Sequence, residues 1–161
     1  MSKGTGKPIV LADSREKCSL PLSDAVEVRV RALRAGDYGD AFRRVRLERK
    51  RVDELATCCG QDRRRFLAQC ERLQDFPIRA LIVEGDLGTI TAGGYRSRIN
   101  PKSVLGTLAK LWVDWGIPPV LCSEAYSAAE LVERLIIRVH RQETERAQLA
   151  TEHPTGEEVA A

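Results

Sequence analysis

The sequence predicts one α/β domain of three layers, in which helices cover both faces of a mixed sheet. Its 161 residues, 43% of them hydrophobic, suffice for one substantial core but are too few for a large second module. Strand-like segments come first and then alternate with helix-like segments, an order typical of helices packed on both faces of a sheet. No internal repeat or linker divides the chain, so a single domain is expected.

Three strands are predicted in the first third of the chain. The apolar run 8–12 ends at Asp13 and is typical of a buried strand with a charged group at its end. Residues 26–33 alternate between apolar and charged side chains, which indicates a half-exposed strand. After the turn 35–39, residues 41–50 alternate again. A third strand is therefore expected, joined to the second by a hairpin-like connection.

Helices and one buried strand are predicted in the middle of the chain. Residues 52–76 carry apolar positions that suit two helices, broken near Gly60 and stopped by Pro77. The short apolar run 79–85 ends in glycine, as expected of a central strand covered on both faces. Residues 86–98 are rich in Gly and Thr and are expected to form a surface loop.

Two more helices with a strand between them are predicted in the last third. Asn100 and Pro101 supply a cap and a first-turn proline for the first of these helices. Residues 119–122 are expected to form the last strand. Ser127 and Glu130 have the spacing of a capping box, which predicts the start of the final helix.

Charge is distributed unevenly along the chain. The net charge is +3, but residues 143–161 hold five glutamates against Arg146 alone, so this tail carries −4 and the rest +7. The domain is expected to span residues 8–142, followed by an acidic, disordered tail over residues 143–161. A mildly basic body suits a polyanionic partner, although an excess of this size is common on ordinary surfaces.

The composition narrows the chemistry. Five cysteines without a C-x-x-C pair fit reduced thiols, and no apolar segment is long enough for a membrane span or a signal peptide, so a soluble intracellular protein is expected. Only two histidines are present, which leaves little for a zinc site or a histidine-based nuclease. Any metal must therefore be held by carboxylates, a ligand choice that favours Mg²⁺ or Mn²⁺.

Acidic groups stand at predicted strand ends and turns, namely Asp13, Asp37 and Glu48. On an extended strand Glu48 and Lys50 point to the same face about 7 Å apart, because side chains alternate. A fold that returns Asp37 beside this strand would let Asp37 and Glu48 bind one divalent ion, with Lys50 near the attacking water or a phosphate oxygen. Phosphodiester hydrolysis needs such an arrangement of charges.

Three ordered motifs carry a family resemblance: Asp13-Ser14-Arg15-Glu16, Gly36-Asp37-Tyr38 and Glu48-Arg49-Lys50-Arg51-Val52-Asp53-Glu54-Leu55. They resemble the D-x-R-E, G-D-Y and E-R-K-x-x-x-D signature of the XPF/Mus family of structure-selective nucleases, the excision-repair cross-complementing group 4 type. The likeness covers about residues 8–142. A lone E-x-K would be weak evidence, whereas three motifs in the same order are specific.

The resemblance implies a restriction-endonuclease-like α/β/α fold with a central mixed sheet, and Mg²⁺- or Mn²⁺-dependent cutting of branched or flapped DNA in repair or recombination. Asp37 and Glu48 would then be metal ligands and Lys50 the group that positions water. Asp13 would lie at the same metal site or a second one. The remaining candidates would have supporting roles. Arg15 and Arg49 would bind the scissile phosphate or brace the acids, and Asp53 would support the E-R-K strand.

Further basic residues are candidates for DNA phosphate contacts, although solvated surface is an equally good interpretation for most of them. They are Arg44, Arg46, Arg96, Arg98 and Lys102. Trp112 and Trp115 are candidates for a self-association face, with core burial the favoured expectation for Trp112.

Two other functions stay open at this point. The family includes pseudonuclease partners, so a catalytically inactive DNA-binding subunit or scaffold is the main alternative, and a regulatory module whose tail recruits a partner is the third. A homodimer, or pairing with a helicase or other DNA-binding partner, is expected because the helix-hairpin-helix domain typical of the family has no counterpart here. Stand-alone versions resemble bacterial or phage nucleases. The expected location is the cytoplasm or nucleoid for such a source and the nucleus for a eukaryotic one.

Overall fold

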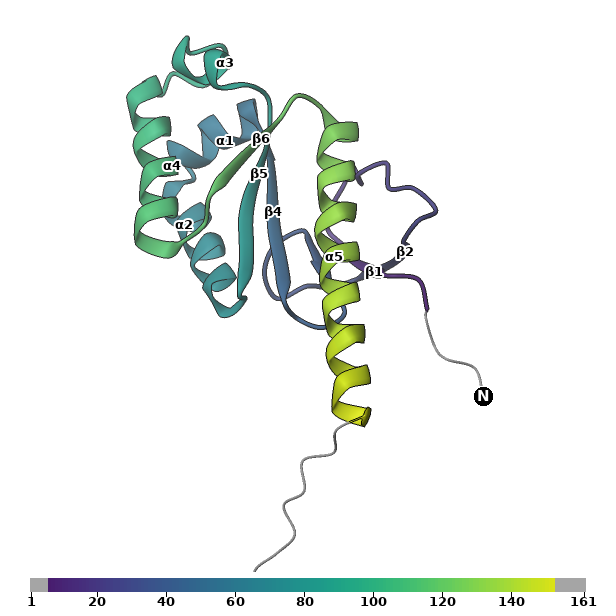
Figure 1. The fold of residues 1–161 in the computed structure, drawn as a ribbon. Coiled ribbons are helices and arrows are strands. Elements are labelled where there is room, and N and C mark those ends of the chain that lie inside the picture. The colour runs from purple at the N-terminus through teal and green to yellow at the C-terminus, as the bar shows by residue number, and fades with distance from the viewer. Residues whose placement is uncertain (1–5, 153–161) are drawn as a thin grey trace, which may run out of the picture.

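A six-stranded mixed sheet forms the middle of the molecule in the computed structural model, which describes residues 6–152 (Figure 1). The strand order is β2-β1-β3-β4-β5-β6. Strands β1 and β2 are parallel, β3 is antiparallel to both of its neighbours, and β4, β5 and β6 are parallel. The strands are β1 (Ile9–Asp13), β2 (Glu27–Arg31), β3 (Tyr38–Asp40), β4 (Val45–Arg51), β5 (Ile78–Glu84) and β6 (Pro119–Cys122).

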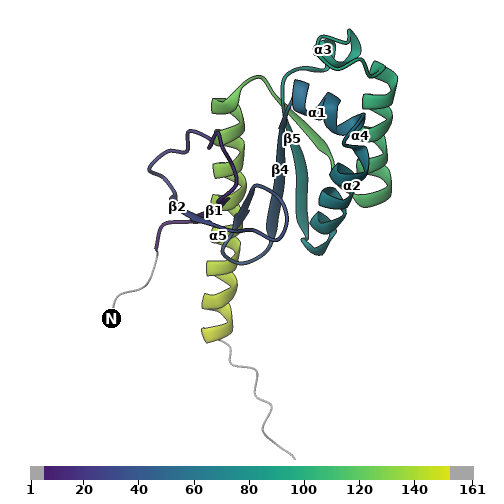
Figure 2. The same cartoon turned by 180° about the vertical axis from the view of Figure 1, so that it is seen from behind.

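Helices cover both faces of the sheet, which confirms the three-layer prediction. The long helix α5 lies alone across one face, and the other helices pack against the opposite face, as the view from behind also shows (Figure 2). None of the helices in residues 6–152 is long and apolar enough to span a membrane. The helices are α1 (Val52–Cys59), α2 (Arg63–Glu71), the 3-10 helix η1 (Arg72–Asp75), α3 (Leu87–Thr91), α4 (Pro101–Trp115) and α5 (Ala125–Glu152).

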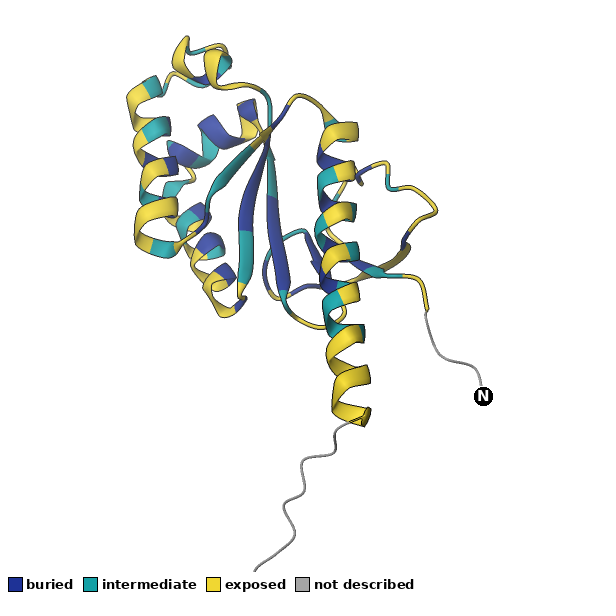
Figure 3. Cartoon of the chain, in the orientation of Figure 1, coloured by how far each residue is buried: buried dark blue, intermediate teal, exposed yellow. Residues whose placement is uncertain are grey.

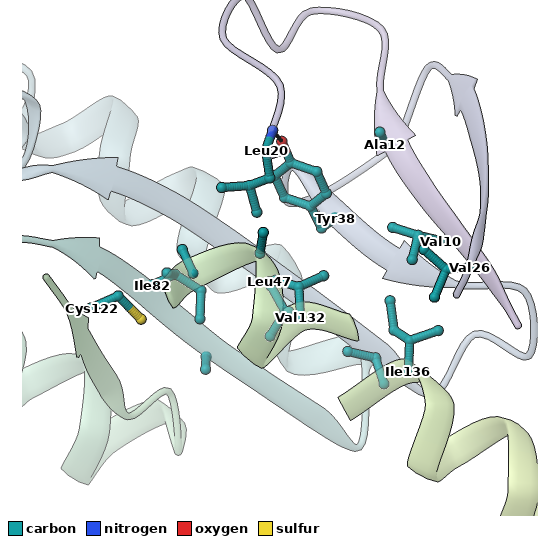
Figure 4. Close-up of a cluster of buried hydrophobic side chains, with 14 of the residues drawn as sticks. Val10, Ala12, Leu20, Val26, Tyr38, Leu47, Ile82, Cys122, Val132 and Ile136 are labelled. Atoms are coloured by element: carbon teal, nitrogen blue, oxygen red, sulfur yellow. Dashed lines mark hydrogen bonds between the residues drawn. The ribbon is translucent and has the colours of Figure 1, made fainter. Parts of the chain in front are cut away.

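Two apolar cores lie on the two sides of the sheet, because side chains alternate along each strand. On the α5 side Leu47 and Ile82 pack against Val132 and Ile136 (Figure 4). On the other side Leu81 and Val83 belong to the core formed with α1, α2 and α4. Strand β5 is therefore buried on both faces, as predicted, and the dark strands of Figure 3 lie between the two helical layers.

The first hairpin differs from the prediction. The short strand β3 was not predicted, and it is β3, rather than the strand over residues 26–33, that forms the hairpin with β4. Strand β2 instead lies at the sheet edge, parallel to β1, with every residue exposed. Strand β4 begins at Val45 instead of residue 41, because Asp40 accepts backbone hydrogen bonds from Phe42, Arg44 and Val45 and holds a turn there.

Several local signals in the second half are confirmed. The helical region breaks at Gly60 and ends before Pro77, and Asn100 caps α4 by accepting a hydrogen bond from the Lys102 amide. The loop expected over residues 86–98 contains the short helix α3, which Asp86 caps at its N-terminus.

The last helix and its neighbour depart from the predictions. Helix α5 begins at Ala125, so Ser127 lies inside the helix and the capping-box prediction is wrong. The helix continues to Glu152, ten residues past Gln142, so residues 143–152 are helical rather than disordered. Residues 153–161 of the predicted tail lie outside the described residues. Trp112 is 60% exposed on α4, which overturns its expected burial.

Candidate active site

Strand β4 places the central charged residues. Its apolar residues Val45 and Leu47 face the α5 core, so Glu48 and Lys50 point to the opposite face. Only 4% of Glu48 is exposed. Lys50 Nζ donates a hydrogen bond of 2.6 Å to Glu48 Oε1, which confirms that the two side chains share one face.

Backbone pairing brings Asp37 beside this strand. Gly36 adopts φ +67°, and a Cβ there would lie 2.8 Å from the Leu47 carbonyl oxygen, so the turn requires glycine. The Asp37 amide donates to the Leu47 carbonyl, and Asp37 Oδ2 accepts a 2.8 Å hydrogen bond from the Arg49 amide. The Gly-Asp-Tyr motif is thus tied to the Glu-Arg-Lys motif across the β3–β4 hairpin.

Each of these two acids keeps one oxygen free. Among residues 6–152, no protein donor reaches Asp37 Oδ1 or Glu48 Oε2. The only side-chain atoms in the same range that are both unpaired and buried belong to Arg46, so both oxygens are open to the cleft. Burial and the adjacent Glu48 carboxylate raise the pKa of Asp37 to about 7. Positive charge placed beside the two carboxylates would therefore favour their ionised forms.

Lys50 supplies part of that positive charge. Burial works against its ammonium, but the Glu48 carboxylate and its hydrogen bond raise the pKa of Lys50 above the ordinary value. Lys50 Nζ also donates to the Arg49 carbonyl. The ammonium therefore stays charged throughout the physiological range, held at the rim of the two carboxylates.

Asp13 has a different environment in the same cleft. Arg15 donates to both of its carboxylate oxygens from Nε and Nη2 and to Oδ1 from its amide, and the buried Leu33 amide donates 2.7 Å to Oδ2. The hydrogen bonds from Arg15 hold the pKa of Asp13 at about 2 despite the opposing effect of burial. Both Asp13 oxygens thus accept hydrogen bonds that brace the end of β1, and its role as a metal ligand stays a prediction.

Arg49 points away from the two open acids. It lies on the other face of β4, where its Nε pairs with Glu84 and its Nη1 lies 3.7 Å from Glu16 and donates to the Cys18 carbonyl. The Arg49 side chain thus pairs with Glu84 and Glu16 rather than with the candidate metal ligands, and its role at the scissile phosphate stays a prediction. Glu84 was missed in the sequence, although it ends a buried strand next to β4, the same signal that selected Asp13.

Among residues 6–152, the Asp53 side chain makes no hydrogen bond or salt bridge to the Glu-Arg-Lys strand. It stands in the first turn of α1, where its Oδ1 accepts a 2.8 Å hydrogen bond from the Arg96 amide. It therefore fastens the segment between α3 and α4 to the edge of the cleft, and brings the exposed Arg96 to that edge.

These groups line one open cleft of about 760 Å³. Arg96 also lines this cleft, whereas Arg98 and Lys102 are exposed but do not. Arg44 is engaged by Glu143 of α5, and Arg46 is almost fully buried. The cleft's candidate residues are Asp13, Arg15, Asp37, Glu48, Arg49, Lys50 and Asp53.

The donor set fits a hard divalent cation held by two carboxylates. No cluster of three or more His, Cys, Asp or Glu side chains suited to a metal occurs in the described chain, so Asp37 and Glu48 would have to share the ion with a backbone carbonyl, water or substrate. Mg²⁺ is commonly bound in this way, through one or two carboxylates with waters and phosphate oxygens completing the shell. Burial and the Glu48 carboxylate raise the pKa of Asp37, so a cation between the two carboxylates would favour their charged forms.

Comparisons with known proteins agree with this geometry. The chain is similar to the structure of XPF from Aeropyrum pernix, with a TM-score of 0.69 and 26% identity over 91% of this chain and 73% of that one. It is also similar to XPF from Aeropyrum pernix in complex with DNA, with a TM-score of 0.68 and 26% identity over 84% of this chain and 66% of that one. Comparison with curated protein sequences gave no match.

A family model agrees with the structural likeness. The model described as the ERCC4 domain matches residues 12–135, which include the three motifs and both covering layers of the sheet. This is the nuclease family whose signature the motifs resemble, and the match extends over more than half of the chain. The chain is therefore a member of the ERCC4 domain family.

Proposed function

We propose that the chain is a metal-dependent, structure-selective DNA endonuclease that hydrolyses phosphodiester bonds in branched or flapped DNA during repair or recombination. The observation that carries the proposal is the convergence of Asp37, Glu48 and Lys50 in one open cleft. Membership of the ERCC4 domain family and the likeness to an XPF structure determined with DNA support the choice of substrate.

The chemistry follows from the free oxygens and the ammonium. Asp37 Oδ1 and Glu48 Oε2 would hold Mg²⁺ or Mn²⁺, and a bound divalent ion stabilises developing charge on the phosphate and lowers the pKa of bound water. Glu48 orients Lys50 through the 2.6 Å hydrogen bond. Lys50 in turn holds a positive charge beside the phosphate, where charge increases as the attacking oxygen approaches.

The test is cleavage of labelled flap, fork, four-way junction and plain duplex DNA with Mg²⁺, Mn²⁺ or EDTA. Asp37→Asn and Glu48→Gln keep the shape of each side chain but remove its charge, and each should lower the cutting rate by about 10²-fold or more. Glu130→Gln is the matched control, because Glu130 is an exposed carboxylate on α5. Binding of Mn²⁺, followed by electron paramagnetic resonance, should weaken in both site variants and stay unchanged in the control.

The alternative is a DNA-binding subunit without catalysis. It predicts equal binding of branched DNA by all variants and cutting by none, an outcome that would refute the nuclease. Retention of the lysine and of both acids, each with an oxygen that no donor within residues 6–152 reaches, favours the enzyme. A homodimer stays a prediction, and sedimentation of a monomer with full cutting activity would refute it.

A further inference from the structure

A second cavity, separate from the open acids, is lined by six arginines. It has a volume of about 490 Å³ and lies between the end of β2, the β3–β4 turn and η1. Asp75 is the only acidic residue in its lining. We call it the arginine cavity, and its six arginines are Arg29, Arg31, Arg34, Arg43, Arg46 and Arg72.

Four of these arginines have no hydrogen-bond or salt-bridge partner among the described residues. Within residues 6–152, the exposed Arg31, Arg34, Arg43 and Arg72 form no salt bridge and their side chains make no hydrogen bond, whereas Arg29 pairs with Glu27. Exposed arginines close together repel one another unless an anion lies between them. The cavity thus concentrates positive charge at a concave surface.

Arg46 is the least expected member. It is 6% exposed, and its Nε and Nη1 are the only buried side-chain nitrogens or oxygens without a hydrogen-bond partner in the described chain. Its guanidinium lies 4.3 Å from the centre of the Phe76 ring, which offsets part of the cost of burying the charge. The nearby acid, Asp40, is already occupied by three backbone amides. Asp40 attracts the Arg46 guanidinium through its charge but accepts no hydrogen bond from it, so Nε and Nη1 keep unfilled donors, and an anion in the cavity would further stabilise the buried charge.

The backbone is shaped to hold this guanidinium. Gly39 faces Arg46 across the β3–β4 pair, and a Cβ on Gly39 would lie only 2.2 Å from Arg46 Nη1. In the adjoining turn Arg43 has φ +60°, a left-handed conformation that side chains other than Gly, Asn and Asp rarely adopt. Strain of this kind persists where the surrounding structure or a function requires it.

The arginine cavity adjoins the active-site cleft. Arg34, Ala35 and Arg72 line both. Strand β4 also links the two, because Arg46 and Glu48 are two residues apart on the same strand face, about 7 Å along the strand. A polyanionic chain seated at Glu48 and Lys50 would therefore reach the arginines with its next phosphates.

We propose that the arginine cavity binds a backbone phosphate of the DNA strand that is cut, close to the scissile phosphate. This inference rests on the proposed nuclease function, whose substrate path it extends from the two carboxylates to the arginines. Arginine suits the role, because its planar, permanently charged group binds phosphate oxygens in pairs.

The variant that tests the proposal is the double substitution Arg31→Gln and Arg43→Asn. Both side chains are exposed, and asparagine tolerates the left-handed backbone at position 43, so the fold should be kept. The matched control is Arg138→Gln with Arg141→Gln, which removes the same charge from exposed positions on α5, across the sheet. Arg46 is left unchanged, because substituting a buried residue would confound binding with stability.

The measurement is binding of flap DNA in EDTA, with single backbone phosphates replaced one at a time by neutral methylphosphonate. We expect one or two adjacent positions near the cut site at which neutralisation weakens binding of the parent protein by about tenfold, and has no further effect on the double variant. The double variant should raise the KM for cutting and leave kcat within about twofold, because the contact is made before and during the reaction. The control should behave as the parent throughout.

Other outcomes separate the ligand sources and the two proposals. The inference would be overturned if the scan found no phosphate position whose effect depends on Arg31 and Arg43. It would also be overturned if inorganic phosphate shifted the Arg46 Nε–H resonance but the scan found no such phosphate position. That result would assign the cavity to free anions. A clear position in the scan without cutting by any variant would refute the nuclease and support the phosphate site.

Discussion

Asp13 and Asp37 line the same cleft, yet the protein treats their carboxylates in opposite ways. Asp13 receives a full set of hydrogen bonds from Arg15 and the Leu33 amide, which hold its pKa at about 2. Asp37 receives one amide hydrogen bond and faces another carboxylate, and its pKa is raised to about 7. The difference separates an acid whose two oxygens both accept hydrogen bonds from one that keeps an oxygen without a donor among the described residues.

Both acids stand at sequence positions that look alike, at the end of a strand or turn and beside a charged motif. The distinction lies in what surrounds each oxygen, so the substitutions below should affect different quantities at the two places.

The largest effect is expected at Lys50, beside the Asp37 and Glu48 carboxylates. Lys50→Met should lower kcat by about 10²–10³-fold, because the ammonium is the protein's own positive charge at the reacting phosphate. Lys110→Met, which removes a partly exposed lysine of α4 that pairs with Asp114, is the control. Single-turnover cutting rates at saturating protein measure the effect. A variant that cuts normally would show that Lys50 serves only as the partner of Glu48.

A loss of stability is expected when Asp13 is substituted. Asp13→Ala leaves the buried Leu33 amide and Arg15 without their acceptor, and should lower the free energy of unfolding by about 3 kcal/mol. The stabilisation from Asp13 is complete above the unfolded pKa of 3.8 and is lost as pH falls toward the folded pKa of about 2. Urea unfolding from pH 2 to 7 measures it. Equal stability of parent and variant at pH 7 would contradict the assignment.

The opposite sign is expected at Asp37. Its folded pKa of about 7 exceeds the unfolded value of 3.8, so the folded state holds an extra proton between these values and loses stability as pH rises through the window. In EDTA, Asp37→Asn should therefore match the parent near pH 4 and exceed it by about 2 kcal/mol at pH 8, once solvent screening in the open cleft is allowed for. Urea unfolding at the two pH values measures the gap. If the variant exceeded the parent in unfolding free energy by the same amount at both pH values, titration of Asp37 would not be the cause of the difference.

The smallest effect is expected at Asp53, which has neither role. Asp53→Ala removes an exposed hydrogen bond to the Arg96 amide, so stability should fall by only about 0.5–1 kcal/mol. Hydrogen exchange should accelerate at the Arg96 amide and leave the Arg49 amide unchanged. Faster exchange at the Arg49 amide would instead support the prediction that Asp53 stabilises the Glu-Arg-Lys strand.

The sequence predicted the layers and the shared face of Glu48 and Lys50 because these depend on local patterns. Strict alternation along β4 placed Glu48 and Lys50 on one face, and the cap at Asn100 marked the start of α4. The first hairpin was assigned wrongly because β3 has only three residues and one is Gly39, too short and too irregular to show a period.

The role of each acid could not be predicted in the same way. Arg15 follows Asp13 in the sequence, but the Leu33 amide that completes its environment is 20 residues away. Arg46 looked like one of several exposed basic residues, and only the pairing of Gly39 with Arg46 across β3 and β4 shows that it is buried. Such long-range contacts leave no periodic signal in the chain.

The backbone bonds across the β3–β4 hairpin fix the distance between Asp37 and Glu48 as firmly as the sheet itself. Substrate choice can then change without disturbing the chemistry, because the cleft is bordered by connecting segments at Glu16–Cys18 and Arg96 that are not part of the hairpin. Insertions in those borders would alter which DNA shapes fit, while the proposed catalytic pair stays in place. A small domain of this design can be adapted to many partners from its edges alone.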